Sequence, residues 1–108
     1  MNIQMQELNY TNFDQWLKDR TALVDFWAEW CRPCKIQHKM LEELTTENKG
    51  LFEIATVNVD DNRTISMKLG VQNIPAMILF KNGNEIRRFT GLQNKKLLLT
   101  QIVNALKD

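Results

Sequence analysis

The chain has 108 residues, of which 44% are hydrophobic and 25% are charged, a size and composition that fit one compact domain and exclude two. Its 14 Lys and Arg residues against 13 Asp and Glu residues give a formal net charge of +1, without a basic block that would follow a nucleic-acid backbone. We therefore expect a single domain over residues 1–108 and no nucleic-acid partner.

The N-terminal segment Met1–Tyr10 has neither the basic residues nor the apolar stretch of a secretory signal. The longest apolar run, Ala76–Phe80, has the length of a strand and falls far short of the roughly 20 residues of a membrane span. We therefore expect a cytoplasmic protein with no membrane attachment. In that compartment thiols are kept reduced, so a cysteine pair is more often catalytic or metal-binding than structural.

The first predicted elements are a strand and a helix. Apolar and polar residues alternate through Ile3, Met5 and Glu7, which is typical of a strand. Thr11 or Asn12 can then cap a helix. The apolar residues of this helix recur at helical spacing: Phe13, Trp16 and Leu17.

The next strand and helix flank the cysteines. Ala22–Ala28 is an almost continuous apolar run interrupted by Asp25, which is typical of a central parallel strand buried on both faces. A helix is predicted from Cys31 to about Asn48, where Lys49-Gly50 can end it. Four of its side chains are expected to face inward: Ile36, Met40, Leu41 and Leu44.

A third strand is predicted over Ile54–Val59. Asp60-Asp61-Asn62 can cap a short helix that ends at Gly70. The apolar residues of this helix are Ile65, Met67 and Leu69.

The C-terminal part predicts a hairpin and a final helix. Strands over Ala76–Lys81 and Glu85–Thr90 flank Asn82-Gly83, the strongest short-range indication of a hairpin. The closing helix, Gln93–Lys107, has an apolar stripe made of Leu97, Leu98, Ile102, Val103 and Leu106. Alternating strands and helices that end in a hairpin predict an α/β fold, with a mixed sheet between helices on both faces.

Cys31-Arg32-Pro33-Cys34 follows a buried strand and opens a helix. Unpaired backbone N–H groups at a helix N-terminus favour negative charge, and the positive charge of Arg32 acts in the same direction, so both favour the Cys31 thiolate. Pro33 suits an early helical position because its φ is preset. The spacing lets Cys34 close a disulfide, which predicts a redox pair with Cys31 as nucleophile and Cys34 as resolving thiol.

Three other roles for the cysteines stay open. A structural disulfide in so small a ring would stabilise the fold by only roughly 2 kcal/mol, and a reducing cytosol would break it. A zinc site would need four ligands, and His38 is the one histidine of the chain, so carboxylates would have to complete it. A cluster bridged between two chains by four thiolates would require a dimer.

Residues 24–35, Val-Asp-Phe-Trp-Ala-Glu-Trp-Cys-Arg-Pro-Cys-Lys, resemble the active-site segment of the thioredoxin family. The resemblance continues in the same order over essentially the whole chain, through Val57-Asn58-Val59-Asp60, Gly70-Val71, Ile74-Pro75, Phe80-Lys81-Asn82-Gly83 and Gly91. It implies a thioredoxin fold, with about five strands and four flanking helices, and reduction of disulfides in other proteins. It also implies a monomer without bound metal or cofactor, recharged by a thioredoxin reductase that draws on NADPH.

The resemblance also assigns substrate contacts. Ile74-Pro75 matches the family's cis-proline turn, which faces the cysteines and pairs with an extended substrate; without the resemblance, a trans proline starting a strand would be the default. Trp27, Trp30, Ile74 and Gly91 match the apolar surface that accepts substrates, and Trp30 is expected to be the more exposed tryptophan. Arg32 and Pro33, between the cysteines, complete the expected substrate-binding set.

Asp25 matches the family's buried aspartate and is expected to act as general base and acid for Cys34. A lone carboxylate in a buried strand is costly to ionise, so its pKa should rise toward neutrality. The alternative is that Asp25 faces water from an irregular strand. Thr56 stands where the family commonly has a lysine, which removes one means of stabilising the ionised form of Asp25.

Arg32 departs from the glycine that is usual in the family. Its charge is expected to stabilise the reduced form, making the potential somewhat more oxidising, and to favour acidic substrates. This leaves two alternative functions: a disulfide oxidase or isomerase, and a non-catalytic binding or cluster-carrying subunit.

Lys39 replaces a proline that is common in the family, so the helix that contains it is expected to run straighter. Asn73 and Ala76 replace common neighbours of Ile74-Pro75 and could redirect specificity.

Overall fold

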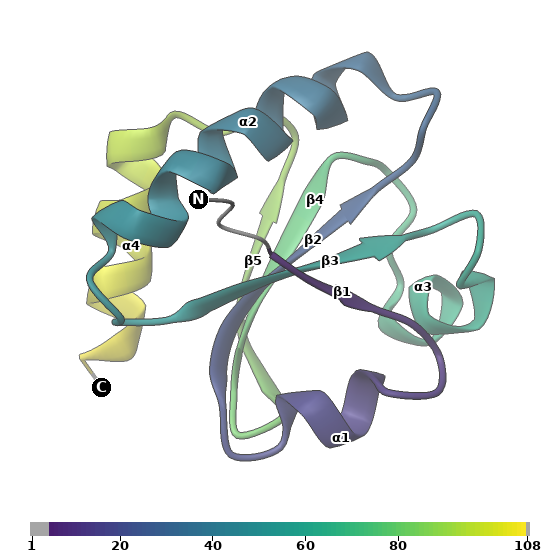
Figure 1. The fold of residues 1–108 in the computed structure, drawn as a ribbon, viewed down its shortest axis with the longest axis horizontal. Helices are drawn as coiled ribbons and strands as arrows, with labels where there is room; N and C mark the ends of the chain where they lie inside the picture. Colours follow the sequence, from purple (N-terminus) through teal and green to yellow (C-terminus); the bar gives the residue numbers. More distant parts are fainter. Residues whose placement is uncertain (1–4, 108) are drawn as a thin grey trace.

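A computed structural model describes residues 5–107, in which a five-stranded sheet lies between two pairs of helices (Figure 1). The sheet order is β1-β3-β2-β4-β5, with β1, β3 and β2 mutually parallel and β4 antiparallel to both of its neighbours. The predicted mixed α/β sheet is therefore confirmed. Along the chain the elements are β1 (Gln6–Leu8), α1 (Phe13–Leu17), β2 (Thr21–Trp27), α2 (Arg32–Glu47), β3 (Glu53–Asn58), α3 (Arg63–Leu69), β4 (Ala76–Lys81), β5 (Asn84–Thr90) and α4 (Lys95–Leu106).

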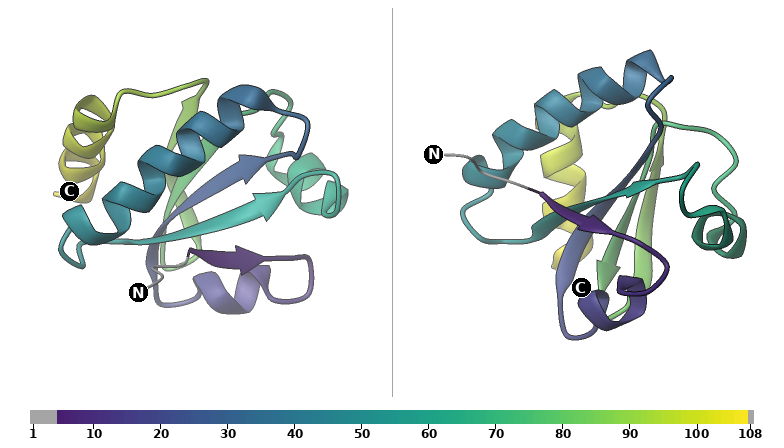
Figure 2. Two further views of the ribbon diagram at one scale, coloured as in Figure 1. Left: turned by 45° about the horizontal axis from the view of Figure 1, so that its top comes forward. Right: turned by 45° about the vertical axis from the view of Figure 1, so that its right-hand side comes forward.

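The central strand β2 contributes to a core on each face of the sheet. The helices α1 and α3 cover one face of the sheet, and α2 and α4 cover the other (Figure 2). Because side chains alternate along a strand, Val24 and Phe26 pack in the core beside α1 and α3, whereas Leu23 packs in the core beside α2 and α4. All three are fully buried. This double burial explains why the β2 sequence is an almost continuous apolar run.

The cysteines lie where β2 ends and α2 begins. Parallel β2 and β3 end at the same edge of the sheet, where the N–H of Val59 donates to the carbonyl of Trp27 over 2.9 Å. Antiparallel β4 begins at this edge, with Ala76 opposite Phe26. The topology therefore gathers the end of β2, the end of β3 and the start of β4 around the cysteine pair.

The buried face of α2 differs from the one predicted. Ile36 is 56% exposed, so its predicted inward position is wrong, whereas Leu41 and Leu44 are buried as expected and Met40 packs partly against the core. The buried side chains of α2 are Cys34, Gln37, Leu41 and Leu44. Cys34 must face the site at the start of the helix, and the helical period then places position 37 inside and position 36 outside.

The final helix also begins and faces differently from the prediction. It starts at Lys95, after Asn94, whose side chain accepts the N–H of Leu97 over 3.0 Å, so Gln93 lies before it. Leu97 is 54% exposed, so the predicted stripe is wrong at this position: Leu98 and Ile102 are fully buried, and the helical period then turns position 97 outward.

Two predicted caps act in other ways. Asn12 precedes α1, but its side chain accepts the backbone N–H of Asn9 rather than one from the helix. Asn62 precedes α3, and its side chain links the N–H of Tyr10 to the carbonyl of Asn58. Met67, one of the three apolar residues of the predicted helix, is 80% exposed and does not contribute to the core.

The hairpin at Asn82-Gly83 is confirmed, because both residues have positive φ and β4 pairs with β5 on either side. Ile3, predicted in the first strand, lies outside the described residues. None of the helices in residues 5–107 has the length and apolar character that a membrane crossing requires.

Candidate active site

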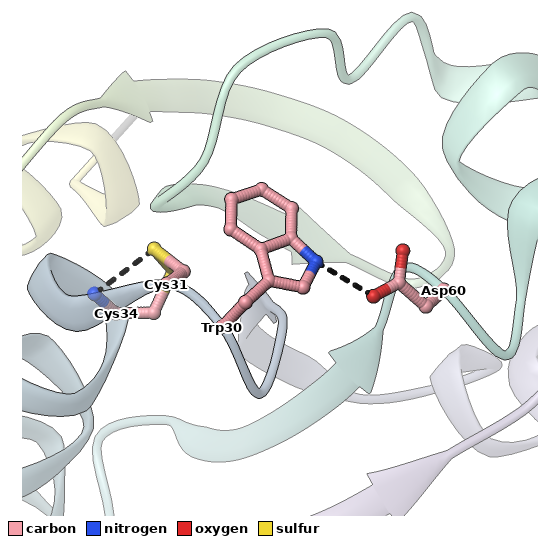
Figure 3. Close-up of a disulfide and its surroundings, with 4 residues drawn as sticks. All are labelled: Trp30, Cys31, Cys34 and Asp60. Carbon is pink, nitrogen blue, oxygen red and sulfur yellow. Dashed lines mark hydrogen bonds between the residues drawn. A yellow bond between two sulfur atoms is a disulfide. The ribbon is translucent and has the colours of Figure 1, made fainter.

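Cys31 and Cys34 form a disulfide at the N-terminus of α2, with their Cα atoms 5.3 Å apart. Cys31 is the N-cap residue, and its Sγ accepts the backbone N–H of Cys34 over 3.2 Å (Figure 3). Pro33 lies in the first turn, where no intrahelical N–H is lost. The helix therefore directs the N–H of Cys34, which has no partner within the helix, and its positive end at the Cys31 sulfur, an arrangement that stabilises a thiolate.

The pair lies in a small apolar cluster with Ala28, against which Trp27 and Ile74 pack. Cys31 keeps 4% of its surface exposed and Cys34 keeps 1%. Cys31 is thus the more accessible cysteine, and it is also the one whose sulfur accepts a helix N–H. Between them, Arg32 and Pro33 are exposed.

Trp30 stands beside the pair and is 71% exposed, which confirms that it is the more exposed of the two active-site tryptophans. Its indole Nε1 donates a hydrogen bond to Oδ2 of Asp60 over 2.8 Å (Figure 3). Asp60 follows β3, so the bond ties the loop before α2 to the neighbouring strand end. The large apolar ring is therefore fixed in place while it remains open to solvent.

The peptide bond between Ile74 and Pro75 is cis, as the resemblance implied. Ile74 packs against the cysteine cluster, and the carbonyl of the buried Pro75 accepts the N–H of Gly91 over 2.8 Å. Gly91 has a φ of 83°, which favours glycine. The structure thus joins the Ile74-Pro75 turn to Gly91 and brings the turn against the cysteines.

Asp25 is fully buried in β2, and the alternative of a water-facing side chain is wrong. Burial raises its pKa from 3.8 to about 7. Its neighbours across the sheet are Thr56 on β3 and Met77 on β4, both uncharged and buried. Among residues 5–107, neither carboxylate oxygen has a hydrogen-bond partner. Asp25 is therefore a carboxyl group able to take up or release a proton near neutral pH.

His38 does not join the cysteines in a ligand set. Its Nε2 lies 3.8 Å from a carboxylate oxygen of Glu42, one turn further along α2, and its ring lies 6.4 Å from that of Trp27. In the part of the chain that the structure describes, no three His, Cys, Asp or Glu side chains gather as metal ligands would. The cysteines are instead bonded to each other.

Sequence reasoning missed Gln37, a fully buried polar residue of α2. Its side chain accepts the N–H of Gln93 over 3.0 Å. The spacing to Cys34, three residues earlier, indicated that position 37 shares the inward face, but a glutamine in an amphipathic helix is usually assigned to the exposed face.

Comparisons with known proteins agree with this geometry. The protein-family model described as Thioredoxin matches residues 4–104. A thioredoxin of Alicyclobacillus acidocaldarius is 37% identical over 101 residues, which cover 93% of this chain and 96% of that protein. A thioredoxin of Rickettsia felis is 43% identical over 84 residues, covering 78% and 80%, and one of Staphylococcus haemolyticus is 40% identical over 88 residues, covering 82% and 85%.

Proposed function

The chain belongs to the thioredoxin family, and on this premise we propose which of its residues act in each step of the reduction of a protein disulfide. The protein is a thiol-disulfide oxidoreductase, a protein-disulfide reductase whose Cys31–Cys34 couple alternates between dithiol and disulfide. The main supporting observation is the disulfide at the N-cap of α2, where the Cys31 Sγ accepts a helix N–H.

In the first step, the Cys31 thiolate attacks one sulfur of a substrate disulfide. A bond forms between Cys31 Sγ and that sulfur while the substrate S–S bond breaks, and the other substrate sulfur leaves as a thiolate that takes up a proton. The N-terminus of α2 and the exposed Arg32 favour the attacking thiolate.

In the second step, Cys34 resolves the mixed disulfide. The Asp25 carboxylate takes the proton of the Cys34 thiol, and the resulting thiolate attacks Cys31 Sγ. The Cys31–Cys34 disulfide forms, the bond to the substrate breaks, and the departing substrate thiolate takes up a proton from solvent while Asp25 releases the one it took, so two electrons and two protons pass to the substrate in total. A pKa of about 7 lets Asp25 exist in both protonation states near neutral pH, as this role requires.

The substrate-docking face consists of Trp30, Arg32, Pro33, Ile74, Pro75 and Gly91. Trp30, Arg32 and Pro33 are exposed beside the nucleophile, whereas the Ile74-Pro75 turn packs close to it and is hydrogen-bonded to Gly91. Apolar contact with this face, together with backbone pairing at Ile74, orients an extended substrate segment. The charge of Arg32 favours acidic segments.

We further propose that a thioredoxin reductase returns the oxidised pair to the dithiol with electrons from NADPH, and that the protein works in the cytoplasm as a monomer with one domain over residues 1–108. The protein itself binds no cofactor in this scheme. The charge of Arg32 beside Cys31 also keeps a second function in consideration, that of an oxidase or isomerase with a higher potential.

The reduction of insulin disulfides by dithiothreitol tests the assignment of the two cysteines. Cys31→Ser is expected to abolish catalysis, because it removes the attacking sulfur. Cys34→Ser is the matched control; it keeps the nucleophile and should accumulate a covalent mixed disulfide with the substrate. Unchanged turnover in Cys31→Ser would overturn the proposal, and the absence of a trapped complex in Cys34→Ser would contradict the resolving role.

A further inference from the structure

Gln37 carries an amide into the core beneath the active-site helix. It lies one turn after Cys34 on α2 and is 0% exposed. Burying an amide is costly unless its polar atoms are hydrogen-bonded, so the partners of this side chain determine what it contributes to the fold.

The partners of Gln37 connect α2 to two other segments of the site. Its Oε1 accepts the backbone N–H of Gln93 over 3.0 Å, and its Nε2 donates to Sδ of Met77 over 3.5 Å. Met77 lies directly opposite Asp25 in the ladder of β2 and β4. The Gln37 side chain therefore joins α2 to β4 at the position opposite Asp25. It also joins α2 to the segment that follows β5.

The segment from Gly91 to Gln93 lies between the end of β5 and the start of α4, so neither element supplies its regular backbone bonds. The N–H of Gly91 donates to Pro75 over 2.8 Å, and the N–H of Gln93 donates to Gln37. The Gln93 side chain closes the segment on itself, donating to the carbonyls of Thr90 and Gly91 over 3.0 and 3.2 Å. The bond to Gln37 thus anchors the C-terminal end of this segment to α2, and the bond to Pro75 anchors its Gly91 end to the turn beside the cysteines.

We propose that Gln37 is a positioning residue, which holds the Gly91 side of the substrate-docking face in register with the active-site helix. This inference rests on the proposed function, because it assigns Gln37 to the binding of protein disulfides. Gln37 acts through Gln93 and Gly91, whereas the sulfur chemistry stays with the cysteine pair.

The test compares Gln37→Met, which keeps the length of the side chain but lacks the acceptor oxygen, with the wild type. The expected result is a KM for insulin that rises about three- to tenfold, the equivalent of one hydrogen bond, with kcat nearly unchanged. The rate with oxidised glutathione should also stay nearly unchanged, because so small a disulfide does not need the whole docking face. Equal losses with both substrates, or an unchanged KM, would overturn the proposal.

Two further variants separate positioning from general destabilisation. Gln37→Glu keeps an acceptor oxygen toward Gln93 and, assayed at about pH 6, where burial keeps a carboxyl group at this position protonated, is expected to restore most of the affinity for insulin. Gln15→Met makes the same chemical change at an exposed position of α1 and is expected to leave KM unchanged. Failure of Gln37→Glu to restore affinity would contradict the hydrogen bond as the cause.

Hydrogen exchange of the Gln93 backbone amide tests the link independently of activity and of the proposed function. In the wild type this amide should be protected, and in Gln37→Met it should exchange faster while the amides of β5 keep their protection. Fast exchange of Gln93 in the wild type would overturn the proposal even if insulin is reduced. Protection of Gln93 without any insulin reduction would keep the link and reject the proposed function.

Discussion

Asp25 is the residue at which the burial of a carboxyl group costs the fold stability, and it is the residue to which we assign the proton transfer of the proposed function. Its carboxyl group is fully buried, and burial raises its pKa to about 7 from 3.8. The folded protein therefore holds a proton that the unfolded chain releases between about pH 4 and pH 7. Because the folded state binds more protons in this range, stability falls as the pH rises and is lowest above pH 7.

Replacing Asp25 with Asn should therefore stabilise the protein at pH 8 by up to about 4 kcal/mol, the equivalent of the pKa shift from 3.8 to about 7. The gain should vanish near pH 3, where the carboxyl group is protonated in both states. Urea unfolding of both proteins at the two pH values measures this. An equal gain in stability at both pH values would show that the burial of a charge is not the cause of the stabilisation.

Arg32 should influence the potential through its charge. Arg32→Gly is expected to make the potential about 5–20 mV more negative, the equivalent of one solvent-exposed charge interaction with the Cys31 thiolate. Equilibration in glutathione buffers measures the shift. Lys18→Gly is the control, because Lys18 is exposed and precedes the opposite end of β2; a shift of the same size there would contradict a local effect of Arg32.

Residues with distinctive chemistry could be predicted from the sequence, and those defined by a contact could not. The spacing of Cys31 and Cys34 after a buried strand indicated the redox pair, and the single charge in β2 indicated the buried Asp25. Gln37 was missed because its role exists only through the N–H of Gln93, which lies 56 residues away along the chain. The apolar Ile36 beside it also pointed to the wrong face of α2.

At the level of elements, α4 offers a direct test of the buried face. Leu98→Ala should destabilise the protein by about 2–5 kcal/mol, because it leaves a cavity between α4 and the sheet, where Leu98 is fully buried. Leu97→Ala makes the same change one position earlier, where the side chain is 54% exposed, and should cost no more than about 0.5 kcal/mol. Chemical denaturation measures both, and similar losses would contradict the orientation of α4.

The strands and the hairpin were easier to predict than the helix faces. The apolar run of β2 and the Asn82-Gly83 turn are directly related to their surroundings, because a strand buried on both faces disfavours polar residues and the turn requires positive φ. The faces of α2 and α4 instead follow from which apolar positions pack on the sheet. In α4 the buried Leu98 and Ile102 define the inward face and leave Leu97 outside, and the run of leucines alone does not distinguish Leu97 from Leu98.

At the scale of the whole molecule, function depends on which segments meet at one edge of the sheet. The order β1-β3-β2-β4-β5 brings Trp30 to Asp60 and the cis Ile74-Pro75 turn to Gly91. Strand-by-strand patterns predict a mixed sheet, but they do not specify which strands are neighbours. The resemblance to the thioredoxin family supplied the grouping of these residues, and the family comparison supports the fold.

The reduction potential of the Cys31–Cys34 couple tests the central claim most directly. The purified protein can be equilibrated in graded thiol-disulfide buffers while the fluorescence of Trp27 and Trp30, beside the pair, reports its oxidation state. A value of about −270 mV is predicted for a reductant of protein disulfides. A value above about −200 mV would contradict the account, because such a couple would donate or rearrange disulfides rather than reduce them.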